Sequence, residues 1–208
     1  DAVVFAGFAK TTVAIFISPT IGFILALTLM LIFSWVFVRA TPGAVDHLFR
    51  YLQFASASLY SLGHGGNDAQ KTMGIIAVLL YSQGQLEGGF HVPFWVVITC
   101  QAAMGLGTLA GGWRIVHTMG SKITRLTPMQ GCAAETGGAI MLFMATHYGI
   151  PVSTTHTITG AIVGVGASKR FSAVRWNVAK DIVIAWFLTM PAAGLIGAAF
   201  YWLARSLG

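Results

Sequence analysis

Long apolar tracts alternate with short polar connectors along the chain. Three tracts, 13–38, 94–113 and 182–203, contain no charged residue. Each is long enough for a bilayer-spanning α-helix, which takes about 20 residues. The pattern predicts three membrane-spanning helices, the last of which contains Pro191 as a tolerated kink.

A fourth apolar region, 49–81, is interrupted by a polar run from Gly63 to Asp68. Glycine lowers helix stability by about 1 kcal/mol per residue, and Asn67 and Asp68 are good caps for a helix that restarts after them. The run therefore predicts a fourth spanning helix, broken at Gly63 to Asp68 into two half-helices.

Two shorter apolar tracts, 129–147 and 153–167, flank the connector 148–152. At 1.5 Å per residue the second tract is about 22 Å long, shorter than the roughly 30 Å hydrocarbon layer. A re-entrant helical hairpin is favoured, and two full crossings remain the alternative.

Composition and charge agree with a membrane protein. Of the 208 residues 56% are hydrophobic and 9% are charged, which excludes an ordinary water-soluble domain. The net charge of +6 does not indicate nucleic-acid binding, because the basic residues lie in connectors. Cys100 and Cys132 lack the spacing of a zinc site or a disulfide framework. We expect an all-α integral membrane protein with about four spanning helices, one of them broken, and a helical hairpin.

The connectors also predict the orientation of the chain. The connector 82–93 has no Lys or Arg, whereas the connectors on the other side of this topology are basic. By the positive-inside rule the basic side is cytoplasmic, and the C-terminus is predicted outside. The residues on the basic side are Arg39, Arg50, Arg114, Lys122, Arg125, Lys169, Arg170, Arg175 and Lys180.

Asp68 is the first candidate functional residue. A carboxylate in a span costs about 2.5–3.5 kcal/mol on insertion scales and usually faces a partner, a cavity or an ion path. Lys71 lies three residues further on and can share its helical face, and Asn67 precedes it. The structural alternative is a buried Asp–Lys pair that stabilises the helix break.

The segment 151–160 carries five hydroxyls in seven residues where a half-helix should begin. Ser153 or Thr154 can cap that helix, and its first N–H groups form an anion site to which the hydroxyls add donors. This suits an oxyanion such as phosphate. Alternatively, the hydroxyls bond to helix carbonyls and Gly160-xxx-Gly164 is a packing face.

Glu135 is a second intramembrane carboxylate, beside Thr136 and Gly137. With Asp68 it could bind a cation or take up a proton, or it could be a buried neutral acid. His64 and His156 adjoin the two polar segments and could relay protons, although a packed histidine is an equal alternative.

Broken helices that present caps and acids near the midplane are typical of secondary transporters, which usually contain two inverted repeats. Each motif occurs once here, and the chain begins with Asp1 rather than Met. We therefore expect 1–208 to be a single transmembrane domain that forms one repeat of a longer protein.

Two segments, 65–74 (GGNDAQKTMG) and 151–156 (PVSTTH), resemble the paired signatures of the inorganic phosphate transporter (PiT) family. Glu135, eighteen residues before Ser153, also fits that family's hairpin glutamate. The resemblance covers essentially the whole chain and implies the C-terminal of two repeats, from a bacterial-type member.

The resemblance implies symport of inorganic phosphate with H⁺ or Na⁺ by alternating access, with no catalytic residue and no cofactor. Asn67 and Asp68 would line the phosphate and cation site, and Glu135 would support cation binding. Donors to phosphate would come from three hydroxyl residues, Ser153, Thr154 and Thr155.

Gln70-Lys71 departs from many members, which have an uncharged asparagine-containing stretch there. An ammonium group disfavours a nearby Na⁺ and could pair with phosphate or Asp68, so Lys71 favours proton coupling.

Several alternatives stay open. The site could take a related oxyanion such as sulfate, although Asp68 can accept a hydrogen bond from protonated phosphate but not from sulfate. A non-transporting membrane subunit comes from a different class, and a membrane enzyme ranks third because no nucleophile and base show recognisable spacing.

The expected partners are phosphate, free or as a metal–phosphate complex, the lipid bilayer, the N-terminal repeat and a second copy of the protein. The resemblance implies a multi-pass protein of the bacterial inner membrane.

Overall fold

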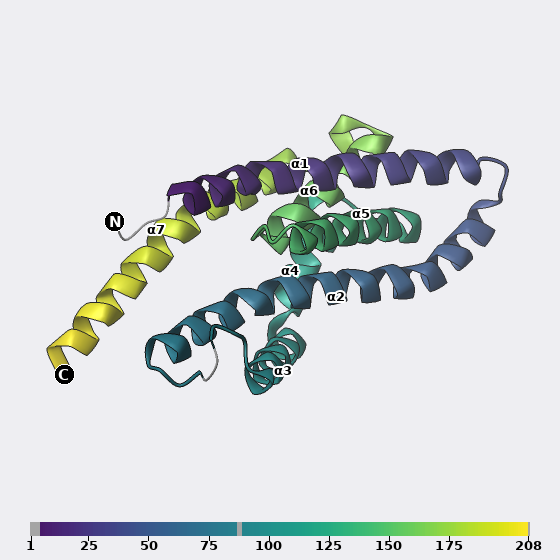
Figure 1. Ribbon diagram of the computed structural model, residues 1–208. Coiled ribbons are helices and arrows are strands. Elements are labelled where there is room, and N and C mark those ends of the chain that lie inside the picture. The colour runs from purple at the N-terminus through teal and green to yellow at the C-terminus, as the bar shows by residue number, and fades with distance from the viewer. Residues whose placement is uncertain (1–4, 87–88, 208) are drawn as a thin grey trace. The chain divides into compact units, whose positions relative to one another are not determined.

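The computed structural model describes residues 5–86 and 89–207, and the regular structure in these ranges is entirely helical (Figure 1). The chain separates into two compact units, 1–174 and 175–208. The elements are α1 (Phe5–Val36), α2 (Pro42–Ser82), α3 (Phe94–Gly111), α4 (Trp113–His117), a π-helical turn (Thr118–Ile123), α5 (Pro128–His147), α6 (Thr154–Lys169), a 3₁₀ turn (Phe171–Ala173) and α7 (Trp176–Leu207).

In the first unit α5 lies between α1 and α2 and packs against both (Figure 1). Helix α6 packs on α1 and α5, and α3 packs on α2. The second unit consists of α7, which continues through Pro191 and whose side chains are mostly exposed. Because α5 packs on α2 and α6 packs on α5, the start of α6, which carries the second signature, lies beside α2.

Glycines bring α1 and α6 into close contact. A Cβ at Gly164 would lie 2.5 Å from the Phe23 carbonyl oxygen, and one at Gly22 would lie 2.6 Å from the Thr157 carbonyl oxygen. A Cβ at Gly160 would overlap the Pro19 carbonyl. The packing interpretation of Gly160-xxx-Gly164 is therefore confirmed.

The hairpin of α5 and α6 matches the predicted tracts. Thr127 and Gln130 form a capping box at the start of α5, and Gln130 also donates to the Val165 carbonyl at 3.2 Å, which joins the two arms. At the tip Gly149 has φ +59° and the Ile150 N–H bonds to the Ala145 carbonyl at 2.9 Å. This is a Schellman ending, which glycine permits because it has no Cβ.

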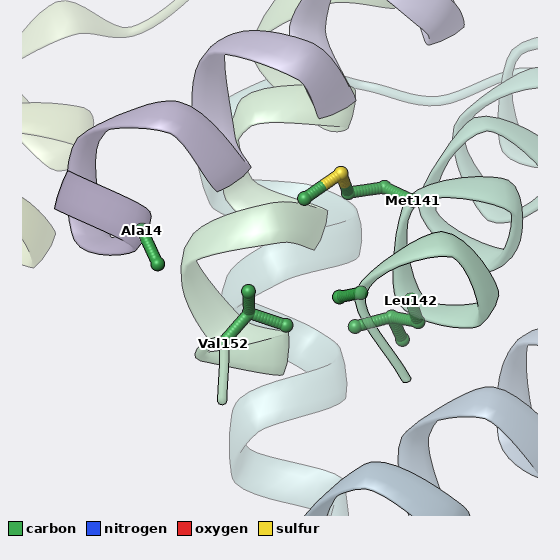
Figure 2. Close-up of a cluster of buried hydrophobic side chains, with 5 residues drawn as sticks. Ala14, Met141, Leu142 and Val152 are labelled. Atoms are coloured by element: carbon green, nitrogen blue, oxygen red, sulfur yellow. The ribbon is translucent and has the colours of Figure 1, made fainter. Parts of the chain in front are cut away.

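An apolar cluster holds the hairpin tip against α1. Figure 2 shows Ala14 of α1 facing Met141 and Leu142 of α5 and Val152, which precedes α6. All four are at most 6% exposed, and Ala145 completes the cluster. Burial of Val152 fixes the backbone that leads into the second signature.

The prediction of a helix broken at Gly63 to Asp68 is wrong, because α2 is continuous from Pro42 to Ser82. Gly63 packs against α5, where a Cβ would lie 3.3 Å from the Leu142 Cβ. The Asp68 carboxylate bonds to side chains rather than capping a new helix. A bilayer core offers no water to backbone groups, so intrahelical bonding outweighs the glycine propensity cost of about 1 kcal/mol per residue.

Within residues 5–86 and 89–207, three helical segments are long and apolar enough to cross a membrane: 7–36, 94–111 and 176–206. Helix α2 is longer than each of them, but it carries Asp68 and Lys71, so a count of four spans depends on it. In α3 the small-residue pattern Gly107-xxx-Gly111 is typical of helix packing, but a Cβ at either glycine meets no described atom within 4 Å. The single domain and the inverted repeat stay predictions.

Candidate functional site

Asp68 lies at the centre of a polar cluster that joins the two signatures. Its Oδ1 accepts a hydrogen bond from Lys71 Nζ at 2.9 Å, and its Oδ2 lies 3.1 Å from His64 Nε2. The Thr154 hydroxyl donates to Oδ2 at 3.1 Å. We call these four residues the Asp68 cluster. The i−4 and i+3 spacing on continuous α2 puts His64 and Lys71 on the face of Asp68.

Lys71 links α2 to the start of α6. Its ammonium group donates to the Val152 carbonyl at 2.7 Å as well as to Asp68. The Asp68 side chain is 25% exposed and that of Lys71 is 42% exposed within this chain. Partial exposure of both side chains does not fit a fully buried Asp–Lys pair.

The start of α6 adds uncharged donors. Ser153 is the N-cap, and its Oγ accepts from the His156 N–H at 3.4 Å. The N–H groups of Thr154 and Thr155 lie in the first turn and have no acceptor within the helix. Thr154 is buried and Thr155 is exposed. Together with Lys71 these groups offer the donors and the positive potential that an oxyanion needs.

Two of the five hydroxyls in this segment are bonded within α6. Thr157 donates to the Ser153 carbonyl at 3.1 Å and Thr159 to the Thr155 carbonyl at 2.7 Å. The back-bonding alternative therefore holds for these two residues, and Ser153, Thr154 and Thr155 remain as ligand candidates.

Asn67 joins α2 to the hairpin. Its Nδ2 donates to the Thr146 hydroxyl on α5 at 3.3 Å, and the residue is 4% exposed. Its Oδ1 is buried and has no hydrogen-bond partner among the described residues. A buried amide oxygen without a donor is suited to a donor or cation supplied by a ligand.

Glu135 lies apart from Asp68. It accepts from the Ser56 hydroxyl at 2.5 Å and from Gln53 Nε2 at 3.4 Å, and we call these three residues the Glu135 cluster. Ser56 and Asp68 are twelve residues apart on one continuous helix, about 18 Å at 1.5 Å per residue. The two carboxylates therefore do not share one site. Glu135 instead borders a cavity of about 630 Å³ that Arg50 also lines.

The two candidate relay histidines have different surroundings. His64 contacts Asp68, whereas His156 is buried and hydrogen-bonded to the backbone of Ile15. Because Pro19 has no N–H, it cannot donate to the Ile15 carbonyl four residues before it. The hydrogen bond with His156 takes the place of that missing bond. The geometry gives His156 a structural contact.

Several residues that complete these clusters were not among the functional residues predicted from the sequence. The Tyr60 hydroxyl donates to the Thr154 carbonyl at 3.3 Å, and the Tyr60 and His64 rings lie 5.9 Å apart. The signal that could have revealed them is a polar stripe at helical spacing along α2. It comprises Gln53, Ser56, Tyr60, His64, Asn67, Asp68 and Lys71.

A family model described as "Phosphate transporter family" matches residues 1–197. The chain belongs to the phosphate transporter family. The resemblance on the signatures 65–74 and 151–156 is thereby confirmed.

Individual relatives agree. Over 204 residues the chain is 72% identical to a "Probable low-affinity inorganic phosphate transporter" of Rhizobium meliloti (strain 1021), covering 98% of the chain and 61% of that relative. A protein of the same name from Bacillus subtilis (strain 168) is 41% identical over 197 residues, covering 95% of the chain and 59% of the relative. The chain thus spans less than two thirds of these relatives.

A solved structure described as "The sodium-dependent phosphate transporter" has the same fold. It superposes with a TM-score of 0.70 at 26% identity, covering 94% of the chain and 56% of that structure. The helical arrangement described above is therefore that of a phosphate transporter fold.

Proposed function

We propose that the full-length protein is a cation-coupled symporter that carries inorganic phosphate by alternating access, and that this chain supplies part of its substrate site. The observation that carries the proposal is the Asp68 cluster, where Lys71 and Thr154 meet one carboxylate at 2.9 and 3.1 Å. The family membership and the names of the relatives support the substrate.

The cluster suits phosphate better than sulfate. Lys71, the α6 N-terminus and the hydroxyls of Ser153 and Thr155 supply donors for a tetrahedral oxyanion. Asp68 and the orphan Asn67 Oδ1 supply acceptors, which a protonated phosphate can satisfy and sulfate cannot.

We propose the proton as the coupling ion. Asp68 already carries Lys71 as a counter-charge, so it offers Na⁺ a weak site. Glu135 accepts from two neutral donors, Ser56 and Gln53, and could take up the proton. His64 beside Asp68 is the candidate relay. The similar solved structure is that of a sodium-dependent transporter, and Lys71 would make the coupling ion different here.

Radiolabelled phosphate uptake into proteoliposomes that contain the full-length parent tests the proposal. A proton gradient and a Na⁺ gradient are imposed separately, with excess sulfate as competitor. We expect uptake that follows the proton gradient and resists sulfate. Uptake that required Na⁺ and ignored pH would refute proton coupling.

The opposite outcome favours another class of protein. No uptake under either gradient, in correctly inserted protein that also binds no phosphate, would indicate a non-transporting subunit in which the signatures only hold helices together.

The membrane arrangement is part of the proposal. We place the protein in a bacterial inner membrane, with an inverted N-terminal repeat completing the site and the C-terminus outside. Labelling of a cysteine introduced near Arg205 by an impermeant reagent in intact cells tests the orientation. Free phosphate, a metal–phosphate complex and a second copy of the protein are the proposed partners.

A further inference from the structure

The Lys71 ammonium group lies between two oxygen atoms that come from separate segments of the chain. Its Nζ lies 2.9 Å from a carboxylate oxygen of Asp68 and 2.7 Å from the backbone carbonyl oxygen of Val152. Carboxylate and carbonyl oxygens are the donors that hard cations prefer. The two oxygens come from α2 and from the segment before α6, so the cation position lies between the two signatures.

The surroundings hold these oxygens in place without Lys71. Asp68 Oδ2 is fixed by the Thr154 hydroxyl and by His64, both at 3.1 Å. Val152 is 4% exposed and is packed in the apolar cluster at the hairpin tip. Removing the ammonium group would therefore leave a carboxylate and a carbonyl facing the space that it filled.

We propose that Lys71 is a tethered substitute for a coupling Na⁺ ion, and that it determines which cation the transporter uses. The ammonium group and Na⁺ each carry one positive charge, and two such charges cannot share the same two oxygens because they repel at this distance. With Lys71 present the site is permanently filled. With a neutral residue at position 71 the site takes Na⁺.

The consequence for transport rests on the proposed symport, but the cation site does not. Sodium binding can be measured on purified protein without phosphate and without a gradient. Failure of the transport proposal and failure of the cation proposal are thus separable.

The binding experiment uses full-length Lys71→Gln protein in detergent. The melting temperature is measured in NaCl and in choline chloride at equal ionic strength. We expect NaCl to raise it for Lys71→Gln, because a ligand that binds only the folded state stabilises it. Wild type and Lys71→Arg, which keep a positive charge, should show no difference between the salts. Lys10→Gln, an exposed lysine of α1, is the matched control.

The uptake experiment compares the same proteins. For Lys71→Gln we expect phosphate uptake to rise about tenfold as Na⁺ goes from a tenth of its Kd to ten times its Kd, following site occupancy. Wild-type uptake should not change with Na⁺ at constant pH.

Two results would overturn the proposal. One is a wild-type protein that Na⁺ itself stabilises and stimulates. The other is a folded Lys71→Gln protein whose melting temperature ignores Na⁺. If that variant does not fold, Lys71→Met, which also leaves both oxygens free, decides in its place. A sodium-dependent melting temperature without any uptake would support the cation site and count against the symport.

Discussion

Asp68 and Glu135 are two carboxylates in one set of packed helices, and their surroundings differ in kind. Asp68 is surrounded by a lysine, a histidine and a threonine hydroxyl, each within 3.1 Å of one of its carboxylate oxygens. Among the described residues Glu135 accepts from Ser56 and Gln53, which are neutral. One carboxylate has a counter-charge in direct contact and the other does not.

The difference is the physical basis for the division of roles proposed for the two carboxylates. The side chains that contact Asp68 provide a fixed set of charges and hydrogen-bond donors, which is suited to recognition of a charged solute. A carboxylate with neutral partners at the edge of a cavity can gain or lose a proton without leaving a cation unpaired. The continuous helix holds the two clusters about 18 Å apart.

The largest effect should come from Asp68→Asn. Asparagine keeps the shape of the side chain but leaves the Lys71 ammonium group without its carboxylate. In the proposed site the Asp68 carboxylate also accepts a hydrogen bond from protonated phosphate, and a hydrogen bond to a charged group contributes about 1.5–3 kcal/mol. Loss of about 2 kcal/mol in phosphate binding should lower uptake roughly 30-fold. Uptake by the full-length parent in proteoliposomes measures it.

Asp46→Asn on the same helix is the matched control, because Asp46 is exposed near the start of α2. Its uptake should remain within about twofold of wild type, as expected for an exposed charge. Unchanged uptake by inserted Asp68→Asn protein would remove Asp68 from the proposed site.

Glu135→Gln should have a smaller energetic effect. Glutamine has one acceptor oxygen where Glu135 uses one oxygen for Gln53 and the other for Ser56, so one charge-assisted hydrogen bond becomes neutral and the other must rearrange around the new NH2 group. The expected loss is about 1–1.5 kcal/mol in the free energy of unfolding. Phosphate exchange across the membrane should continue, whereas accumulation driven by a proton gradient should stop. Thermal unfolding and the two transport modes measure these effects.

Glu135→Ala sharpens the result, since it leaves the Ser56 hydroxyl and the Gln53 amide without their shared acceptor. It should destabilise the protein more than Glu135→Gln does. Proton-driven accumulation by Glu135→Gln at the wild-type level would move the coupling site away from Glu135.

Much of the fold could be predicted from hydropathy and turn residues. The apolar tracts predicted three spans, and Gly149 with Pro151 marks the hairpin tip. The signatures indicated that Asp68 and Thr154 belong to one site, and the two residues are in contact. These features follow from local sequence, because burial in lipid and turn geometry act over a few residues.

The continuity of α2 and the separation of Asp68 from Glu135 could not be predicted in this way. Helix propensity alone marks Gly63 as a helix breaker, whereas its contact with Leu142 favours a small residue at this position. Once a break was assumed, the polar stripe from Gln53 to Lys71 no longer formed one helical face. Tertiary packing decided both points.

Gly66→Ala tests the continuous helix that separates the two carboxylates, with the smallest expected effect. A Cβ at Gly66 meets no described atom within 4 Å, so alanine adds helix propensity without a clash. We expect the free energy of unfolding to rise by about 0.5–1 kcal/mol. The same change at Gly63 should raise the free energy of unfolding by a smaller amount, because the new Cβ lies 3.3 Å from the Leu142 Cβ. Thermal unfolding of both variants measures the difference.

A lower melting temperature for Gly66→Ala than for wild type would mean that α2 bends at this glycine. The separation of about 18 Å assumes a straight helix at 1.5 Å per residue, so it would then no longer hold.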